Sequence, residues 1–189
     1  MRIVAGAAKG RRLTVPSGHD VRPTADRAKE ALFASLQPQL AQARVLDLYA
    51  GSGSLGLEAL SRGAAGVTFV ERERRALEAL RRNIEVVALP GTTVVAAPVE
   101  RALAEPLAGG PFDLVLADPP YHTPKAEVAQ MLAALVAQLA EGATVVLERS
   151  VRDGSPTWPD GFERGEPRRY GDTVLHRARW SAPEERSGG

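Results

Sequence analysis

The stretch Val45-Leu46-Asp47-Leu48-Tyr49-Ala50-Gly51-Ser52-Gly53-Ser54-Leu55-Gly56 decides the fold of this chain. Its first half, together with the preceding arginine, is mainly apolar and predicts a buried strand over residues 44–49. Its second half carries glycines in the pattern G-x-G-x-x-G and leads into a predicted helix over residues 55–62. Glycines at such a position allow a tight turn and let the backbone approach a ligand closely. The stretch therefore predicts a strand, a cofactor-binding loop and a helix in direct succession.

Strand-like and helix-like segments alternate through the rest of the chain. Further strands are expected at Gly66–Glu71, Thr92–Ala97, Phe112–Asp118 and Thr144–Ser150. Helices are expected at Arg74–Val87, Val99–Leu107 and Lys125–Leu139. Such alternation predicts an α/β fold in which helices cover both faces of a parallel sheet.

The two ends of the chain add smaller elements. Glu163–Tyr170 and Thr173–Trp180 flank a Gly-Asp turn and predict an antiparallel hairpin, so we expect a mixed seven-stranded, Rossmann-like sheet. At the start, Arg2–Ala5 and Arg11–Val15 predict a basic β-hairpin arm over residues 1–22. Residues 23–180 would then form the Rossmann-like domain, opening with a helix at Thr24–Leu36, and residues 181–189 a flexible tail.

A second motif, Asp118-Pro119-Pro120-Tyr121, comes at the end of a predicted strand. Two consecutive prolines cannot continue a strand ladder, because neither carries a backbone N–H. An acidic side chain, a rigid backbone corner and an aromatic ring therefore reach the carboxyl end of a strand together, where ligands bind in open α/β sheets. This combination suits a planar group that bears an amine.

Two acidic residues indicate what the glycine loop binds. Glu71 follows Gly51 by twenty residues, the spacing of an acid that binds ribose hydroxyls. On that evidence alone a nicotinamide dinucleotide fits as well as any other adenosine cofactor. Asp47 adds a carboxylate near the loop, where it would disfavour a pyrophosphate and tolerate a cation. S-adenosylmethionine carries a sulfonium and an ammonium group and is therefore the favoured cofactor.

The composition excludes several kinds of site. Without cysteine the chain has no disulfides or Cys-based metal sites, and the histidines at 19, 122 and 176 show no metal-ligand spacing. No apolar run reaches membrane-spanning length and no hydrophobic signal segment opens the chain, so we expect no metal, no membrane and a cytoplasmic location. The net charge of +1 divides into +4 over residues 1–30 and −3 over the remainder. This asymmetry fits a basic phosphate-binding segment on a mildly acidic body and fits a solvated surface hairpin equally well.

Several of these motifs together resemble a known family. Asp47–Gly53 resembles the first motif of class I S-adenosylmethionine-dependent methyltransferases, and Asp118–Tyr121 resembles their motif for methylating exocyclic nitrogens of bases. Three further stretches narrow the resemblance: Arg22–Arg27, Ser54–Gly63, and the opening Met1–Val4 with Gly6 and Lys9-Gly10-Arg11. From Arg2 to about Trp180, the chain resembles the RsmD family of small-subunit ribosomal RNA guanine-N2 methyltransferases.

The resemblance implies methylation of N2 of guanine 966 in 16S rRNA, with S-adenosylmethionine as donor and the assembled or assembling small ribosomal subunit as partner. We expect a monomer. The expected catalytic residues are Asp118, Pro119, Pro120 and Tyr121. The expected cofactor-binding residues are Asp47, Tyr49, Ala50, Gly51, Gly53, Glu71, Arg72, Val99 and Asp118. Around Val99, the segment 96–99 lacks the acid that many class I enzymes place beside the adenine, so backbone groups and apolar packing would bind it.

The expected RNA-binding residues are Lys9, Arg11, Arg12, Arg22, Thr24 and Arg27. The last three could instead close the cofactor pocket around the methionine carboxylate, and the sequence does not decide between these roles. In the transfer site, Asp118 or the carbonyl of Pro119 would accept a hydrogen bond from the amine and direct its lone pair, while Tyr121 would stack on the extruded base.

Other functions fit parts of the same pattern. A nicotinamide-dependent oxidoreductase would use the glycine loop and Glu71, but it leaves Asp47 and Asp118–Tyr121 without a role. A non-catalytic RNA-binding protein would not need the intact acidic residues. Methylation of adenine N6 in DNA or RNA is the nearest alternative reaction, because the same tetrad serves it. A protein-glutamine target usually goes with asparagine in place of Asp118.

Overall fold

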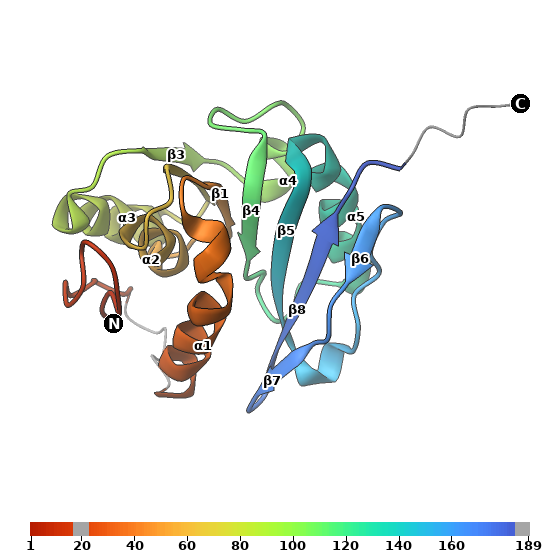
Figure 1. Ribbon diagram of the computed structural model, residues 1–189, viewed down its shortest axis with the longest axis horizontal. Helices are drawn as coiled ribbons and strands as arrows, with labels where there is room; N and C mark the ends of the chain where they lie inside the picture. Colours follow the sequence, from red (N-terminus) through yellow and green to blue (C-terminus); the bar gives the residue numbers. More distant parts are fainter. Residues whose placement is uncertain (17–22, 184–189) are drawn as a thin grey trace, which may run out of the picture.

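The computed structural model describes the backbone of residues 1–16 and 23–183, and the side chains of these residues except 23–28. Strands β1 (Arg44–Leu48), β2 (Gly66–Glu71), β3 (Thr92–Ala96), β4 (Phe112–Ala117) and β5 (Leu139–Ser150) run parallel to one another. β8 (Thr173–Trp180) pairs antiparallel with β5, and β6 (Phe162–Arg164) and β7 (Arg168–Tyr170) both pair with β8. The order β3-β2-β1-β4-β5-β8-β6 gives a mixed sheet seven strands wide, as predicted (Figure 1).

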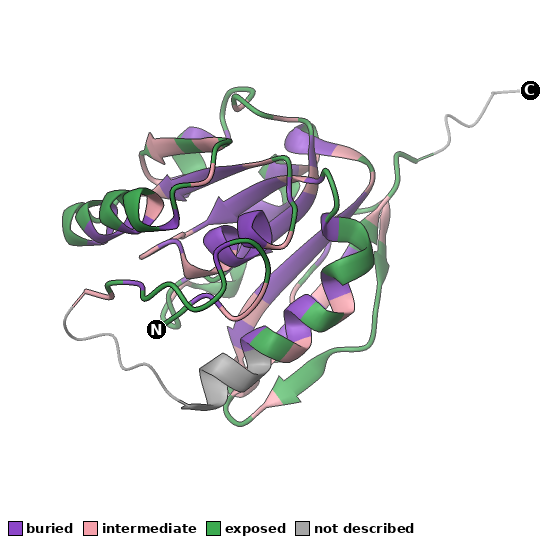
Figure 2. Ribbon diagram, turned by 60° about the vertical axis from the view of Figure 1, so that its left-hand side comes forward, coloured by how far each residue is buried: buried purple, intermediate pink, exposed green. Residues whose placement is uncertain are grey.

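Helices cover both faces of this sheet. Helices α1 (Pro23–Leu40), α2 (Ser54–Ser61) and α3 (Arg74–Val87) lie on one face, and α4 (Val99–Ala102) and α5 (Lys125–Leu135) lie on the other (Figure 1). Each face has its own apolar core, because alternate residues of a strand point to opposite sides. In β1, Val45 belongs to the first core and Leu46 to the second. Burial is accordingly concentrated along the central strands and the inner sides of the helices (Figure 2).

Several element boundaries differ from the predictions. The predicted helix Lys125–Leu139 ends at Leu135 and passes through a short 3-10 turn into β5, which begins at Leu139. The predicted strand Glu163–Tyr170 is divided into β6 and β7. Its interruption contains Pro167, which has no N–H to donate to β8. Helix α1 continues to Leu40 and contains Pro38.

The N-terminal segment forms one isolated antiparallel bridge between Arg2 and Arg12, and the predicted pair of strands is not formed in residues 1–16. The segment instead packs on the body: Ile3 and Leu13 belong to the core beneath α1 and α2. The buried Glu58 of α2 accepts the N–H groups of Val4 and Ala5 at 2.8 and 3.1 Å. These hydrogen bonds hold the basic segment against α2, and they join residues that lie 53 and 54 positions apart in the sequence.

The order of the central strands creates a crevice. The chain leaves β1 toward β2 on one side, whereas β4 pairs with β1 on its other side. Ligands bind in α/β sheets at such a switch point, beyond the carboxyl ends of the strands. Tyr49 follows β1 and Asp118 follows β4, so both predicted motifs lie at this point of the sheet.

Candidate active site

The glycine loop makes the turn from β1 into α2. Gly51 and Gly53 have φ values of 56° and 80°, in the left-handed region that glycine adopts without strain. Tyr49 has a φ of 58°, and for a tyrosine this conformation is costly. Strained backbone persists where the surrounding structure holds it, and it often lies at ligand-binding sites.

Gly56 allows α2 to approach the sheet closely. A Cβ atom at this position would lie 2.4 Å from Cε1 of Phe69 and 2.7 Å from Cγ1 of Val67. A larger residue there would force either the helix or these side chains to move. The three glycines of the pattern therefore have different roles: two set the turn and the third sets the distance between helix and sheet.

Glu71 lies at the end of β2 and faces the glycine loop. Its Oε2 accepts the N–H of Gly51 at 2.8 Å, and its Oε1 accepts the N–H groups of Arg72 and Glu73 at 2.7 Å each. These bonds hold the carboxylate beside the loop while part of the residue remains open to solvent. An acceptor held there fits the ribose-binding role predicted for Glu71.

Asp47 lies below the loop, inside the protein. It is 2% exposed, and its Oδ2 accepts the N–H of Gly56 at 2.8 Å. Burial raises the pKa of Asp47 to about 8, with a smaller contribution from the charge of Glu71, while the bond from Gly56 lowers it. Asp47 thus fixes the start of α2 and is largely protonated at neutral pH. It can act on a cationic ligand through its charge, because a nearby cation favours ionisation.

The remaining predicted cofactor residues surround the same edge of the sheet. The N–H of Ala50 donates to the carbonyl of Val70 at 3.1 Å, which joins the loop to β2. Arg72 is exposed beside Glu71. Val99 is 3% exposed and packs in the core below α4, so it offers almost no surface to a ligand in this structure.

The tetrad Asp118–Tyr121 leads from β4 into a closed turn over residues 120–123. The N–H of Asp118 reaches the carbonyl of Leu48 at 3.4 Å, so the tetrad begins directly beside the end of β1. The N–H of Thr123 donates to the carbonyl of Pro120 at 2.9 Å and closes the turn. Tyr121 is 58% exposed, one of two large apolar or aromatic side chains among the described residues that stand out into solvent. An exposed ring on a rigid turn is available for stacking on a base.

The electrostatic surroundings of Asp118 are unusual. Asp118 is exposed and directly follows the buried end of β4. Desolvation of its carboxyl group, followed by the negative charges of Glu148 and Asp47, raises the pKa of Asp118 well above its usual value, while Arg149 lowers it. Perturbed titratable groups of this kind concentrate at functional sites.

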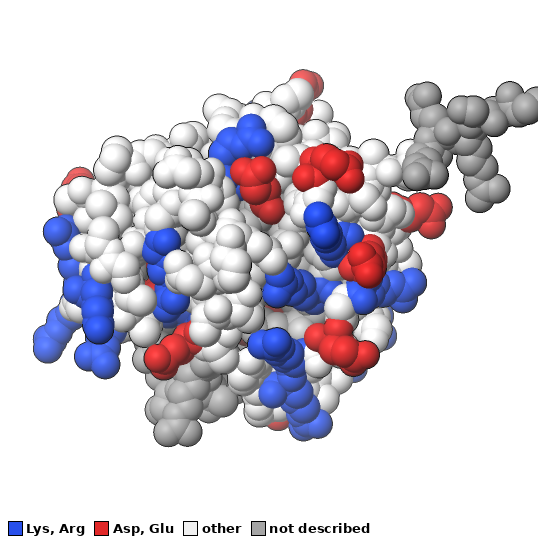
Figure 3. Space-filling view, viewed as in Figure 1, with Lys and Arg blue, Asp and Glu red and all other residues white. Residues whose placement is uncertain are grey.

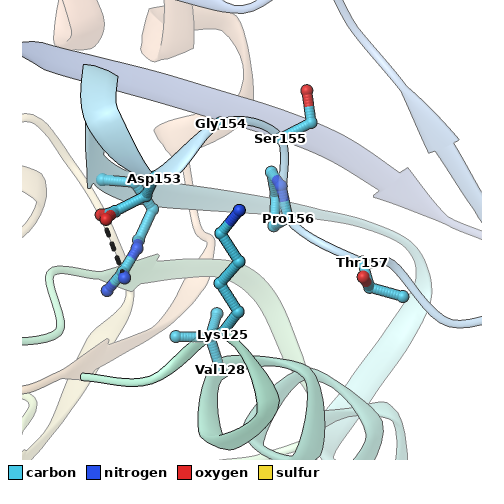
Figure 4. Close-up of a pocket in the computed structure, with 8 residues that line it drawn as sticks. Lys125, Val128, Asp153, Gly154, Ser155, Pro156 and Thr157 are labelled. Carbon is cyan, nitrogen blue, oxygen red and sulfur yellow. Dashed lines mark ion pairs between the residues drawn. The ribbon is translucent and has the colours of Figure 1, made fainter.

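Two neighbours of the tetrad, Glu148 and Arg149, were not predicted from the sequence. Both lie near the end of β5, next to β4. The buried Arg149 donates through Nη2 to the carbonyl of Thr123 at 2.9 Å and pairs with Asp153 at 3.0 Å. A pocket lies beside this pair, and the side chain of Lys125 extends into it (Figure 4). The signal in the sequence was the apolar run before Glu148, which parallels the run before Asp118.

The predicted RNA-binding residues divide into two groups. Lys9, Arg11 and Arg12 are exposed, and Arg11 donates through Nη1 to the carbonyls of Val86 and Val87 at the end of α3. Basic side chains gather over α3 and the N-terminal segment, on the left of Figure 3. Arg22 and the side chains of Thr24 and Arg27 lie outside the described residues, so their two predicted roles stay open.

Two classes of site are absent from the described residues. Residues 1–16 and 23–183 hold no group of three or more acidic, histidine or cysteine side chains that could bind a metal ion. No helix in that part of the chain is both long and apolar enough to cross a membrane.

Comparison with known proteins identifies the family. The model of a family described as "Conserved hypothetical protein 95" matches residues 1–179. The ribosomal RNA small subunit methyltransferase D of Escherichia coli K12 is 39% identical over 159 residues, which cover 84% of this chain and 79% of the relative. This chain belongs to that methyltransferase family. The corresponding methyltransferase D of Haemophilus influenzae is 41% identical over 131 residues, 68% of each chain.

Solved structures agree with the family assignment. The "putative methyltransferase yhhF" of Escherichia coli superposes with a TM-score of 0.85 at 32% identity, covering 97% of this chain and 99% of that one. A magnesium protoporphyrin IX methyltransferase from Synechocystis, solved with bound S-adenosylmethionine, has a TM-score of 0.68 at 18% identity over 86% of this chain and 82% of that chain. The second likeness shows the class I methyltransferase fold alone.

Proposed function

We propose that this protein transfers a methyl group from S-adenosylmethionine to the exocyclic N2 of a guanine in 16S rRNA, at the position that the family resemblance gives as guanine 966. The proposal rests mainly on one observation: the glycine loop and the tetrad lie beside each other at the carboxyl ends of β1 and β4. The glycine loop with Glu71 and the tetrad Asp118–Tyr121 follow adjacent strands, joined by the contact between Asp118 and Leu48. Membership of the methyltransferase D family then favours ribosomal RNA as substrate.

The residues present fit S-adenosylmethionine. When bound, this cofactor supplies a methyl group activated by a positively charged sulfur. Gly51 and Gly53 leave the loop free of side chains, Glu71 offers carboxylate oxygens, and Asp47 lies below as a group that a cation would ionise. A pyrophosphate fits less well, because carboxylates already accept the N–H groups of Gly51 and Gly56 that would bind it. These contacts favour a methyltransferase over a nicotinamide-dependent enzyme.

The tetrad would orient the guanine that receives the methyl group. The lone pair of guanine N2 is conjugated with the ring, so the amine is a weak nucleophile. An acceptor beside its N–H, such as ionised Asp118, directs the lone pair and stabilises positive charge on nitrogen. Tyr121 stacks on the extruded base, an interaction worth about 1–3 kcal/mol. The two prolines keep the turn in one conformation at low entropic cost.

Transfer of labelled methyl to unmethylated small ribosomal subunits tests the proposal. Naked 16S rRNA and duplex DNA serve as parallel substrates, and Asp118→Ala serves as the inactive variant. A matched control is Asp113→Asn, a carboxylate at the opposite end of β4 that pairs with Arg44 at 3.2 Å. We expect label in the subunits with the control and none with Asp118→Ala. Label in DNA alone would indicate that the substrate is adenine in DNA. Cofactor binding without transfer to any of the three substrates would contradict the substrate assignment.

A further inference from the structure

We propose that Glu148 is the second carboxylate of the transfer site: it shares one proton with Asp118 and thereby sets the protonation state in which Asp118 meets the exocyclic amine. The inference rests on the proposed function and assigns Glu148 a positioning role, since it acts through Asp118. It accounts for a pair of acidic residues at adjacent strand ends.

The sheet register brings the two carboxylates together. Ala117 of β4 pairs with Leu147 of β5, and Asp118 and Glu148 are the next residues of the two parallel strands. Neighbouring strands lie about 5 Å apart, so the two acids start from adjacent backbone positions. Both belong to the edge of the sheet at which the glycine loop lies.

Other strands also contribute to the surroundings of Glu148. Leu175 of β8 lies directly opposite Glu148, and Arg168 of β7 pairs with Leu175 on its far side. The hydroxyl of Thr173, also on β8, hydrogen-bonds to the Glu148 carboxylate. From β1, Asp47 adds a negative charge near Asp118.

Cations also lie near the pair. Arg177 of β8 pairs with Val146, two residues before Glu148, and so lies on the same face of the sheet. Arg149 follows Glu148 in β5, so its side chain leaves the opposite face, although its charge still acts on Asp118. On α1, the side chains of residues 23–28 lie outside the described part of the chain. The first described cation of that helix, Lys29, pairs with Glu58 at 3.6 Å.

Two acids in this setting do not both ionise readily. Burial raises the pKa of Glu148, although the bond from Thr173 opposes the shift. Desolvation and the charge of Glu148 raise the pKa of Asp118, and Arg149 opposes that shift. Paired carboxylates with such interactions lose their protons in two separate steps that belong to the pair. Over the range between these steps, the pair carries one proton and one negative charge.

The singly protonated pair completes the proton balance of the reaction. When the N–C bond forms and the C–S bond breaks, the amine must lose one N–H proton. The pair, which carries one proton and one negative charge, takes up that proton, and one proton then leaves to water through the partly exposed Glu148. The pair returns to its starting state with one proton delivered to solvent.

The first test is a carboxyl titration of the free chain, which needs neither RNA nor cofactor. Carbon-13 NMR of protein labelled at the aspartate and glutamate carboxyls follows both groups, and Asp118→Asn identifies the Asp118 signal. In Glu148→Gln we expect Asp118 to ionise in one step, at a pH lower by about one unit. An unchanged Asp118 titration would overturn the proposal.

The second test is the pH dependence of methyl transfer to small ribosomal subunits. Glu148→Gln should move the acidic limb of the kcat profile down by about one pH unit, whereas Asp113→Asn should leave it in place. A lower rate at every pH without a shift would mean a merely structural role. Absence of transfer by the wild type would reject the proposed function while leaving the NMR result valid.

If Glu148→Gln does not fold, Thr173→Val provides a second test. It removes the hydroxyl bonded to the Glu148 carboxylate and keeps the charge. The Glu148 titration should then move to higher pH, and the Asp118 titration should change with it. Independent movement of the two signals would contradict a shared proton.

Discussion

At the scale of single residues, the active-site edge depends on carboxyl groups whose surroundings oppose ionisation. Asp47 and Asp118 both have raised pKa values, and burial or desolvation is the main cause in each. Asp47 is buried and bonded to Gly56, whereas Asp118 is exposed. The first therefore shapes the loop, and the second can meet a substrate.

Asp47→Asn is expected to stabilise the free protein in a pH-dependent manner. The pKa of Asp47 is about 8 in the folded state and 3.8 in the unfolded state. The free energy of unfolding of the wild type therefore falls as pH rises from about 4 to about 8. Asparagine does not titrate and can still accept the Gly56 N–H. Thermal unfolding should give equal Tm values near pH 4 and a Tm at least about 3 °C higher for the variant at pH 8.

The same substitution should weaken binding of a cationic cofactor, because an asparagine side chain cannot ionise in response to it. Calorimetric titration with S-adenosylmethionine measures this loss. A Tm difference that is constant from pH 4 to pH 9 would contradict a raised pKa of Asp47 in the folded state.

Substitutions of Tyr121 test whether the tetrad binds the base by stacking. Replacement by alanine removes an exposed ring and should lower kcat/KM for the RNA substrate by roughly 10- to 100-fold, equivalent to about 1–3 kcal/mol. Tyr121→Phe keeps the ring and should retain most of the activity. Steady-state kinetics on small subunits compares the two. Equal losses in both variants would assign the role to the hydroxyl instead of the ring.

At the scale of elements, the position of α2 depends on close packing at Gly56. Gly56→Ala places a methyl group against Phe69 and Val67 and should destabilise the protein by about 1–3 kcal/mol. Gly165→Ala is the matched control, because its nearest neighbour, the carbonyl oxygen of Arg177, would lie at 3.4 Å. Urea unfolding measures both variants. A Gly56→Ala protein as stable as the control would show that α2 can shift without cost.

The central elements could be predicted because each is encoded locally. The ranges of β2 and α3 agree with the sequence prediction, since an apolar run and a regular charged helix identify them. The division into β6 and β7 was missed because it depends on pairing with β8. The site was predicted at its two motifs, but Glu148 and Arg149 become recognisable as its neighbours only when β5 lies beside β4.

At the scale of the whole molecule, the N-terminal segment combines packing with charge. Ile3 and Leu13 are buried, and Glu58 binds the backbone of the segment while pairing with Arg62 at 2.7 Å. The sequence could not show this docking, because the partners are more than 50 residues apart. The division into a basic arm over residues 1–22 and a domain over residues 23–180 remains a prediction. So do the roles of the arm's basic residues.

Those roles can be measured apart from the packing. Lys9→Gln with Arg12→Gln removes two exposed charges and should leave the Tm unchanged. If both contact phosphates, RNA affinity should fall and the slope of log K against log salt should decrease by about 1 for each lost contact. Filter binding to 16S rRNA over a salt series gives the slope. An unchanged slope would place the RNA on another surface.

Identification of the methylated nucleoside tests the proposed transfer reaction itself. Small subunits are treated with S-adenosylmethionine and either the wild type or Asp118→Ala, and the 16S rRNA is digested and analysed by mass spectrometry. We expect N2-methylguanosine at position 966 with the wild type and its absence with the variant. Methyl on any other base, or equal N2-methylguanosine from the variant, would contradict the proposed reaction.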